Sequence, residues 1–403
     1  MVETRDKLEF VGQRAPLSAD EPATLVDVYE RMVRVHPQPD TLNYKRDGTW
    51  HSISSNEMLA RARRIALGLY SLGVRKDDRV ALLSESRVEW VLADQGCIFA
   101  GAVGVPIYPT LTPSQAAYIL KDSGARVMFV SDRAKFDEIE TGLDECPALE
   151  HVVLFESDKP TGSKLLTLEQ LQERGRKVES QRPELAAELA HAASPEDLAT
   201  IIYTSGTTGE PKGVMLTHAN MVSNLIDSSD HFAFGGKDSA LSVLPLSHGF
   251  ERQAMNMYLY HGMSVYFGES LEKIGVNLRE VHPTVLVGVP RIYEKILAKV
   301  QDRAAAKSRL NGAVFSWAVE IGKQCAQLAS DRRPVPLLLA LKRKVADVIA
   351  FKRWRQAMGG RIRIFVSGGA PLSDDVALAF AGAGMPIVQG YGLTETSPVI
   401  TAG

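Results

Sequence analysis

A stretch rich in hydroxyl groups and glycine runs from Tyr203 to His218 and reads YTSGTTGEPKGVMLTH. Its hydroxyl side chains can donate hydrogen bonds, its glycines let a ligand approach the backbone, and its lysine adds a positive charge. Exposed backbone N–H groups, short hydroxyls and one cation are the groups that hold phosphate. The candidate nucleotide-binding residues in this loop are Thr204, Ser205, Gly206, Thr207, Thr208, Gly209 and Lys212.

The spacing within this loop separates it from the loop of ordinary kinases and GTPases. That loop reads G-x-x-x-x-G-K-[ST] ahead of a helix, whereas here Pro211 precedes Lys212 and Gly213 follows it. The apolar runs 198–203 and 214–216 on either side predict two strands instead. The alternative is a surface turn rich in serine, threonine and glycine. We favour phosphate binding because the donors lie beside a lysine and Glu210 is the only acidic residue.

Two further glycine-bearing segments each follow a predicted strand. The first is VSGGAPL at 366–372, where consecutive glycines would let a flat ligand rest against bare backbone, or would simply serve a tight turn. The second is GYGLTETSP at 390–398. In open α/β folds, ligands bind at the carboxyl ends of strands. We therefore expect the three segments to converge on one crevice.

Other motifs accompany these segments. His248 lies in LPLSHGFER at a predicted strand end, although a lone histidine is more often structural. The strings VPRIYEK at 289–295 and VPIYPTLTP at 105–113 complete the set. Together the motifs resemble the adenylate-forming superfamily over essentially the whole chain. This superfamily includes acyl-CoA synthetases, peptide-synthetase adenylation domains and firefly-type luciferases. The string around His248 resembles a motif of acyl-CoA synthetases near the carboxylate and acyl tunnel. The strings at 289–295 and 105–113 look most like long-chain fatty acyl-CoA synthetases.

The resemblance assigns roles to individual residues. It implies one wall of an adenine pocket at Gly368, Gly369 and Ala370, with Tyr391 stacking on adenine. It also implies that Thr394 bonds the α-phosphate and that Glu395, together with Thr207, holds Mg²⁺. The other residues implied for the nucleotide site are Gln389, Gly390 and Gly392, and those implied for the carboxylate substrate are His248 and Arg291. Lys212, Thr394 and Glu395 would then be the catalytic residues.

The implied reaction joins a long-chain fatty acid to coenzyme A. The carboxylate attacks the α-phosphorus of ATP to give acyl-adenylate and pyrophosphate, and the thioester follows. Alternatives are an acyl-AMP ligase that serves a carrier protein, and a nucleotide- or lipid-binding module without turnover. Family members continue into a small C-terminal domain that builds the coenzyme A site. Because this sequence ends at Gly403, we expect it to bind ATP but to be largely inactive alone.

The elements that position these motifs alternate between strand-like and helical patterns. This alternation predicts an α/β fold of two doubly wound subdomains, with helices on both faces of mostly parallel sheets. The resemblance adds a smaller β subdomain. The pattern is lost over 156–197, so we expect one subdomain at 1–195 and a second at 196–403. The dipeptide Asp47-Gly48 predicts a hairpin.

A helix expected over 337–358 carries an apolar stripe with basic residues around it. The stripe consists of Leu338, Leu341, Val345, Val348 and Trp354. We expect the stripe to pack on a sheet. Contact with an anionic membrane is the less favoured alternative.

Composition narrows the possible partners. The 403 residues are 45% hydrophobic and 23% charged, and 46 basic against 48 acidic residues give a net charge of -2. Such a balance argues against nucleic-acid binding. Three cysteines and nine histidines show no metal-binding spacing. The charged N-terminal residues lack the apolar core of a signal peptide, and no transmembrane segment is evident, so we expect a cytoplasmic setting, with contact at the inner membrane face as an option.

Overall fold

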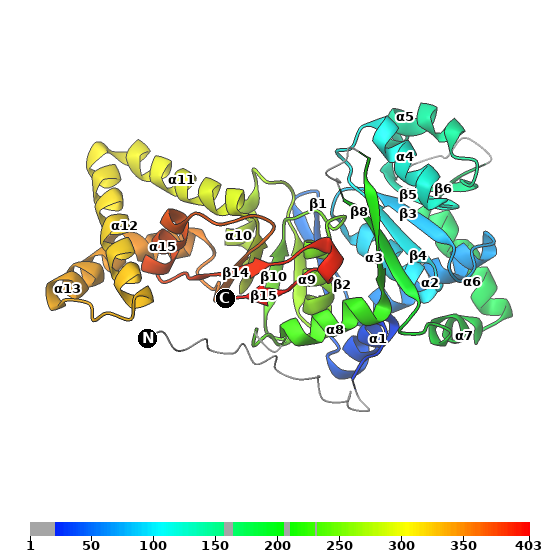
Figure 1. Cartoon of the computed structure of the whole chain (residues 1–403), viewed down its shortest axis with the longest axis horizontal. Helices are drawn as coiled ribbons and strands as arrows, with labels where there is room; N and C mark the ends of the chain where they lie inside the picture. Colours follow the sequence, from blue (N-terminus) through cyan, green and yellow to red (C-terminus); the bar gives the residue numbers. More distant parts are fainter. Residues whose placement is uncertain (1–20, 157–163, 205–209, 230–231) are drawn as a thin grey trace, which may run out of the picture.

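The computed structural model describes residues 21–156, 164–204, 210–229 and 232–403. In these residues, two mostly parallel sheets lie side by side with helices around them (Figure 1). The strand order is β7-β6-β5-β3-β4-β8-β9 in the first sheet and β15-β14-β13-β12-β10-β11-β1-β2 in the second. The α/β fold expected from the sequence is confirmed.

The first sheet is parallel except for its last pair, the hairpin of β8 and β9. Its strands are β3 (Arg79–Leu83), β4 (Val103–Ile107), β5 (Val127–Asp132), β6 (His151–Glu156), β7 (Leu165–Thr167), β8 (Leu198–Thr204) and β9 (Lys212–Thr217). The helices around it are α2 (Ser55–Ser71), α3 (Val88–Phe99), α4 (Pro113–Ser123), α5 (Arg133–Ile139), η1 (Glu140–Glu145), α6 (Leu168–Gln181) and α7 (Leu185–His191).

Both faces of this sheet are covered, because its strands are apolar on both sides. Val80 and Leu82 pack into a cluster with α2 and α3, whereas Ala81 and Leu83 pack into another with α4 and α5. Helix α4 shows how the sequence sets an element's ends. It begins after Thr112, whose hydroxyl accepts from the Gln115 backbone N–H, and ends at Gly124 with φ of 63°.

The second sheet is antiparallel only at its two edges. Its strands are β1 (Leu42–Arg46), β2 (Thr49–Ile53), β10 (Ser239–Ser242), β11 (Ser264–Phe267), β12 (Val285–Gly288), β13 (Ile364–Ser367), β14 (Ile387–Tyr391) and β15 (Thr401–Ala402). The helices associated with it are α1 (Leu25–Val35), α8 (His218–Ser229), α9 (Gly249–Tyr260), α10 (Ile274–Val281), α15 (Asp374–Gly382) and η3 (Thr394–Thr396). The hairpin expected at Asp47-Gly48 joins β1 to β2, and both turn residues have positive φ.

The division between the sheets differs from the boundary expected at residue 195. Strands β8 and β9, which flank the phosphate loop, extend the first sheet, because β8 pairs with β4 and the Thr200 hydroxyl donates to the Gly104 carbonyl at 2.7 Å. The segment 156–197 holds β7, α6 and α7 of that sheet. Conversely, β1 and β2 join the second sheet through β11. Within the described residues the short hairpins extend this sheet, and no third β unit is formed.

A helical arm extends from the second sheet (Figure 1). It consists of α11 (Pro290–Lys307), α12 (Arg309–Ser330), α13 (Leu337–Ala346), a π-helical turn η2 (Asp347–Phe351) and α14 (Lys352–Ala357). The expected burial of the stripe over 338–354 is wrong for four of its five residues. Of the residues in that stripe only Trp354 is buried, because Ala346, Ala350 and Phe351 supply the inward face instead. Among the helices of the described residues, none is long and apolar enough to cross a membrane.

Candidate functional site

The phosphate-loop motif sits at the open end of the β8–β9 hairpin. Thr204 ends β8 and pairs with Lys212, the exposed first residue of β9. The predicted loop residues Ser205, Gly206, Thr207, Thr208 and Gly209 lie outside the described residues. The flanking strands were predicted from the sequence, and they are confirmed. The hairpin thus places a lysine opposite a threonine where the loop leaves the sheet.

Packing around the hairpin explains two residues of the motif. A side chain on Gly213 would begin 2.7 Å from the Ile201 methyl group and 3.2 Å from the Tyr203 ring, so only glycine fits. The Tyr203 hydroxyl donates to Asp122 at 2.6 Å. Burial, followed by this carboxylate, raises the pKa of Tyr203 above its ordinary range, so the phenol stays protonated.

The second glycine motif lies directly after β13. Gly368 is buried against the Phe250 ring, where a Cβ would sit 2.8 Å from a ring carbon. Gly369 has φ of 80°, and Gly369 and Ala370 are exposed. The Ser367 hydroxyl just before them is buried and has no hydrogen-bond partner in the described residues. The backbone here is bare and accessible, as a flat ligand would require.

The third motif follows β14 and turns back into β15. Gln389 and Tyr391 are exposed, and Gly390 is half-buried. A Cβ on Gly392 would lie 1.6 Å from the Pro398 carbonyl oxygen, so this turn requires glycine. Tyr391 is 62% exposed, which leaves its ring open for stacking on a ligand.

Thr394 and Glu395 lie in η3, which packs against β9. The Asn224 side chain on α8 fixes the segment that follows: its amide donates to the Val399 carbonyl at 2.7 Å, and its oxygen accepts from the Val399 N–H at 3.3 Å. A Cβ on Gly249 would lie 3.9 Å from the Thr394 methyl group. The third motif is therefore held beside both the hairpin of Lys212 and the start of α9.

A divalent cation would have few protein ligands here. Glu395 is exposed and forms no ion pair with a described residue. In the described ranges, no group of three or more His, Cys, Asp or Glu side chains is arranged to hold a metal. A single exposed carboxylate suits Mg²⁺, which binds one or two carboxylates and completes its shell with phosphate and water. The residue set thus fits a magnesium nucleotide.

His248 caps the N-terminus of α9. Its Nδ1 accepts from the Phe250 N–H at 3.1 Å, and its ring packs edge-on against Tyr108 with centroids 6.2 Å apart. Desolvation lowers the pKa of His248 from its ordinary value, which favours the neutral imidazole at pH 7. His248 is exposed to solvent, and its hydrogen bond with the Phe250 N–H fixes the orientation of its ring.

A cavity of about 1100 Å³ opens behind the carboxyl ends of β10, β11 and β12. Helices α10 and α11 form much of its wall, and Ala357 and Met358 contribute the end of α14. Arg291 lines the cavity, as expected of a substrate residue, whereas His248 does not.

Two residues of the cavity wall neighbour the motif segments. Pro245, whose carbonyl accepts from the His248 N–H at 3.0 Å, also lines the cavity. Val289 lines it too, and its methyl lies 3.7 Å from where a Cβ on Gly369 would be. Pro245 and Val289 therefore lie between this cavity and the segments that carry His248 and Gly369.

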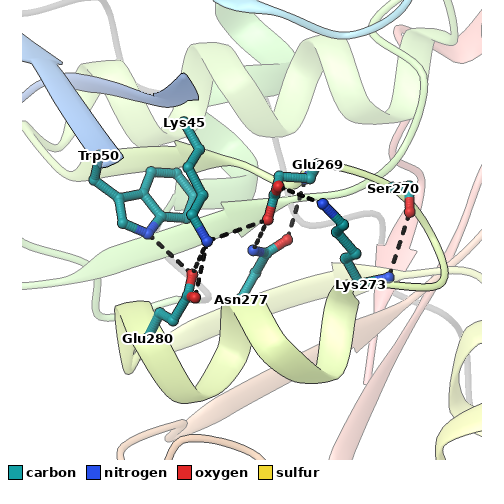
Figure 2. A network of polar contacts seen from close by, with 7 residues as sticks. All are labelled: Lys45, Trp50, Glu269, Ser270, Lys273, Asn277 and Glu280. Carbon is teal, nitrogen blue, oxygen red and sulfur yellow. Dashed lines mark hydrogen bonds and ion pairs between the residues drawn. The ribbon is translucent and has the colours of Figure 1, made fainter. Parts of the chain in front are cut away.

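A polar network that no sequence motif indicates holds α10 in place (Figure 2). The Lys45 ammonium on β1 contacts Glu280 at 2.7 Å and Glu269 at 3.4 Å. Asn277 donates to Glu269 at 2.8 Å, and Lys273 contacts the same carboxylate at 2.8 Å. Hydrogen bonds from Lys273 and Asn277 are the main cause that lowers the pKa of Glu269 to about 2. No motif predicts the contacts of Lys45, because they join residues more than 200 positions apart.

A buried carboxyl group lies behind the same cavity. Glu251 accepts a hydrogen bond from the Ser242 hydroxyl at 2.6 Å, and Ser242 lines the cavity. The other oxygen of Glu251 has no partner in the described residues. Burial raises the pKa of Glu251 to about 8, and the Ser242 hydrogen bond opposes this only partly. The carboxyl is therefore mostly protonated at neutral pH.

Parallel strands explain why these motifs meet. His248 follows β10, Arg291 follows β12, Gly368 follows β13 and Tyr391 ends β14, so all lie at one edge of the second sheet. A fold with this arrangement is that of the adenylate-forming enzymes. An anthranilate CoA ligase, AuaEII, in complex with anthranoyl-AMP superposes with a TM-score of 0.68 at 20% identity, over 94% of this chain and 62% of that one. The N-terminal domain of FACL13 from Mycobacterium tuberculosis gives 0.64 at 22%, over 94% and 78%.

The chain belongs to the AMP-binding enzyme family, whose model matches residues 29–403. Among curated relatives, the long-chain-fatty-acid–CoA ligase FadD15 of Mycobacterium bovis is 37% identical over 94% of this chain and 61% of its own length. The long-chain-fatty-acid–CoA ligase ACSBG1 of Bos taurus is 30% identical over 95% and 53%. The chain thus spans between half and two thirds of the length of these relatives.

Proposed function

We propose that this chain is the nucleotide- and acyl-binding part of a long-chain fatty acid–CoA ligase. The observation that carries the proposal is the 1100 Å³ cavity, which is largely apolar and whose wall at Pro245 and Val289 borders the segments of His248 and Gly369. Its volume exceeds the usual range of small-molecule pockets, and an apolar wall favours an alkyl chain. The names of the similar curated proteins support the same substrate class.

In this proposal the crevice binds ATP with Mg²⁺. Gly368, Gly369 and Ala370 form one side of the adenine pocket, and Tyr391 stacks on the ring. Gln389, Gly390 and Gly392 complete the turn beside it. Lys212 and Thr394 contact the phosphates, and Glu395 holds the cation. The loop residues from Ser205 to Gly209, with Thr207 as a second Mg²⁺ ligand, remain predictions of the motif.

The fatty acid lies in the cavity with its carboxylate toward Arg291 and the His248 loop. The carboxylate attacks the α-phosphorus, pyrophosphate leaves, and negative charge builds on the phosphate oxygens. Preorganised donors and cations stabilise such charge, so no protein nucleophile is required. Coenzyme A then accepts the acyl group in the whole protein. We also propose a cytoplasmic setting with peripheral contact at the membrane.

Pyrophosphate release and direct binding test this proposal. Calorimetry should show binding of ATP and of palmitate, with fatty-acid affinity rising with chain length by about 0.8 kcal/mol per CH₂ until the cavity is full. Pyrophosphate release with palmitate, with and without coenzyme A, separates the ligase from its alternatives. Release that never yields palmitoyl-CoA would favour an acyl-AMP ligase. Binding of both ligands without pyrophosphate release by the whole protein would favour a non-catalytic module, and a preference for acetate or an amino acid would contradict the substrate class.

A further inference from the structure

The outer face of α13 presents large apolar side chains to solvent. Leu337 is 78% exposed, Leu338 67% and Val348 69%, and Leu341 and Val345 are more than half exposed. These five residues, called here the α13 face, lie at one end of the helical arm (Figure 1). Contiguous exposed apolar patches on proteins mark interaction sites, whereas scattered single residues do not.

The helix is oriented with its small residues inward. At 3.6 residues per turn, positions 337, 338, 341 and 345 fall within an arc of about 100°. The inward side carries Ala346, followed by Ala350 and Phe351 in the next turn, and all three are buried. The sequence therefore places Ala346, Ala350 and Phe351 against the body of the protein, with Leu339 half-buried on the same side, and leaves the other leucines facing outward. This pattern is opposite to that of a helix whose apolar stripe packs on its own core.

Basic residues frame the α13 face. On the same helical projection, Lys342 and Lys344 lie at its two edges, whereas the exposed Arg343 falls on the opposite side, where its guanidinium donates to the Gly382 carbonyl at 3.4 Å. Both lysines are exposed and form no ion pair with a described residue. Residues 331–355 contain eight basic and two acidic side chains, a net charge of +6 within a chain whose net charge is -2. Positive charge is thus concentrated around this one apolar surface.

We propose that the α13 face docks onto an anionic lipid bilayer, with the helix lying in the plane of the interface. An apolar stripe buried at the headgroup level, flanked by lysines whose stems reach up to the phosphates, is the arrangement of interfacial helices. Charge complementarity selects this occupant over a second copy of the chain. In a two-fold dimer the face would meet itself, and the lysines at its edges would face like charges.

The docking surface is covalently continuous with the wall of the cavity. Helix α13, the π-helical turn and α14 follow one another without a break, and Ala357 and Met358 at their end line the cavity. Val348 precedes Met358 by a length of about 15 Å of helix. If the proposed function holds, a docked arm would position the acyl pocket near the bilayer, where long-chain fatty acids dissolve. The docking itself does not depend on that function.

Vesicle co-sedimentation tests the proposal on the chain as it is. The probe is phosphatidylcholine vesicles containing about 30% phosphatidylglycerol, compared with phosphatidylcholine alone. The chain should bind the anionic vesicles and should be released as salt rises to about 0.5 M, because salt screens the lysines. Lys342→Gln with Lys344→Gln should weaken binding about 25-fold, since each lysine near an anionic surface contributes about fivefold.

A second double variant tests the apolar contribution. Leu338→Glu with Leu341→Glu should reduce binding by at least about tenfold, because two leucines no longer enter the lipid. The matched controls are Val35→Glu, an exposed apolar residue at the end of α1, and Lys177→Gln, an exposed lysine on α6. Both controls should bind as the unchanged chain does. Thermal unfolding followed by circular dichroism verifies that every variant is folded.

Three outcomes would overturn the proposal. The first is absence of binding to anionic vesicles by the folded chain. The second is equal binding by the two α13 variants and their controls. The third is sedimentation velocity showing a dimer that the leucine variant dissociates while vesicles are not bound, which would assign the face to a second copy. Salt-sensitive binding lost in both α13 variants but kept in both controls would support it.

Discussion

Lys212 carries the positive charge at the open end of the phosphate-loop hairpin. We expect Lys212→Ala to weaken ATP binding about tenfold or more, because a charge-assisted contact contributes on the order of 1.5–3 kcal/mol. Calorimetry with magnesium and ATP measures this directly. The control is Lys177→Ala on α6, far from the motifs, which should leave the affinity unchanged. Equal ATP affinity in the two folded variants would contradict the assignment of Lys212.

The buried carboxyl of Glu251 predicts a particular dependence of stability on pH. Its pKa is raised to about 8 in the folded state, against an ordinary value of 4.5. Between these pH values the folded state holds a proton that the unfolded state has released, so this group lowers stability as pH rises. The slope is at most about 1.4 kcal/mol per pH unit.

Glu251→Gln mimics the protonated carboxyl and keeps an acceptor for the Ser242 hydroxyl. We expect the variant to gain stability relative to the unchanged chain as pH increases from 5 to 8. Urea unfolding at several pH values in this window measures the difference, and contributions from other groups cancel in it. A difference that stays constant across the window would show that Glu251 does not titrate there.

The sequence supplies the candidate site residues individually but indicates few of the contacts that support them. Glycine and hydroxyl residues at 203–213, 366–372 and 390–398 are local signals, because each motif follows its own strand. The contacts that hold them are not local. Asn224 bonds Val399, and Phe250 packs on Gly368, and in neither pair does the sequence around one residue point to the other. Glu251 lies in the same LPLSHGFER motif as His248, but the sequence pattern singles out only the histidine as a candidate site residue.

Helix α10 is the element whose position most directly shapes the cavity. Lys45→Met would keep the apolar stem but remove the ammonium that contacts Glu269 and Glu280 (Figure 2). We expect a several-fold loss of palmitate affinity with ATP affinity unchanged, because α10 lines the cavity and not the nucleotide crevice. Hydrogen exchange should also accelerate in α10. Lys177→Met is the matched control, and unaltered exchange in α10 would show that the network does not restrain the helix.

Element types could be inferred from periodicity, whereas their partners could not. The runs 80–83 and 127–130 are apolar on both faces, which is the pattern of buried strands, and they form most of β3 and β5. The assignment of β8 and β9 to the first sheet depends on the pairing of Thr200 with Gly104, which periodicity does not encode. The 338–348 stripe has the period of a packed helix. The stripe is exposed because the opposite side of the helix, which carries buried alanines, is the side that packs against the rest of the protein.

A buried ion pair joins the two halves of the molecule. Arg252 on α9 contacts Asp94 on α3 at 2.6 and 3.0 Å, and both side chains are almost fully buried. Removing one partner leaves an uncompensated buried charge, so Asp94→Ala should destabilise the chain by about 3–5 kcal/mol. Urea unfolding measures this. Glu173→Ala breaks the exposed pair with Arg176 and should cost no more than about 1 kcal/mol.

The double variant Asp94→Leu with Arg252→Met distinguishes how much stability depends on the ion pair and how much on side-chain packing at these two positions. Because an apolar pair of similar volume needs no desolvation, this variant should recover most of the stability lost in Asp94→Ala. A double variant as unstable as the single one would mean that the ion pair itself specifies how the two sheets meet.

The route of the chain through the two sheets has a consequence during synthesis. Strand β1 pairs with β11, about 220 residues further along, after the chain has built the whole first sheet in between. At about 5–20 residues per second, the β1–β2 hairpin emerges on the order of 10–45 s before its partner strand. Throughout that interval one edge of the hairpin offers unpaired backbone groups to any other strand. The nascent chain is therefore most prone to mispairing and aggregation while the first sheet is folding, and chaperone demand should fall once β11 has left the ribosome.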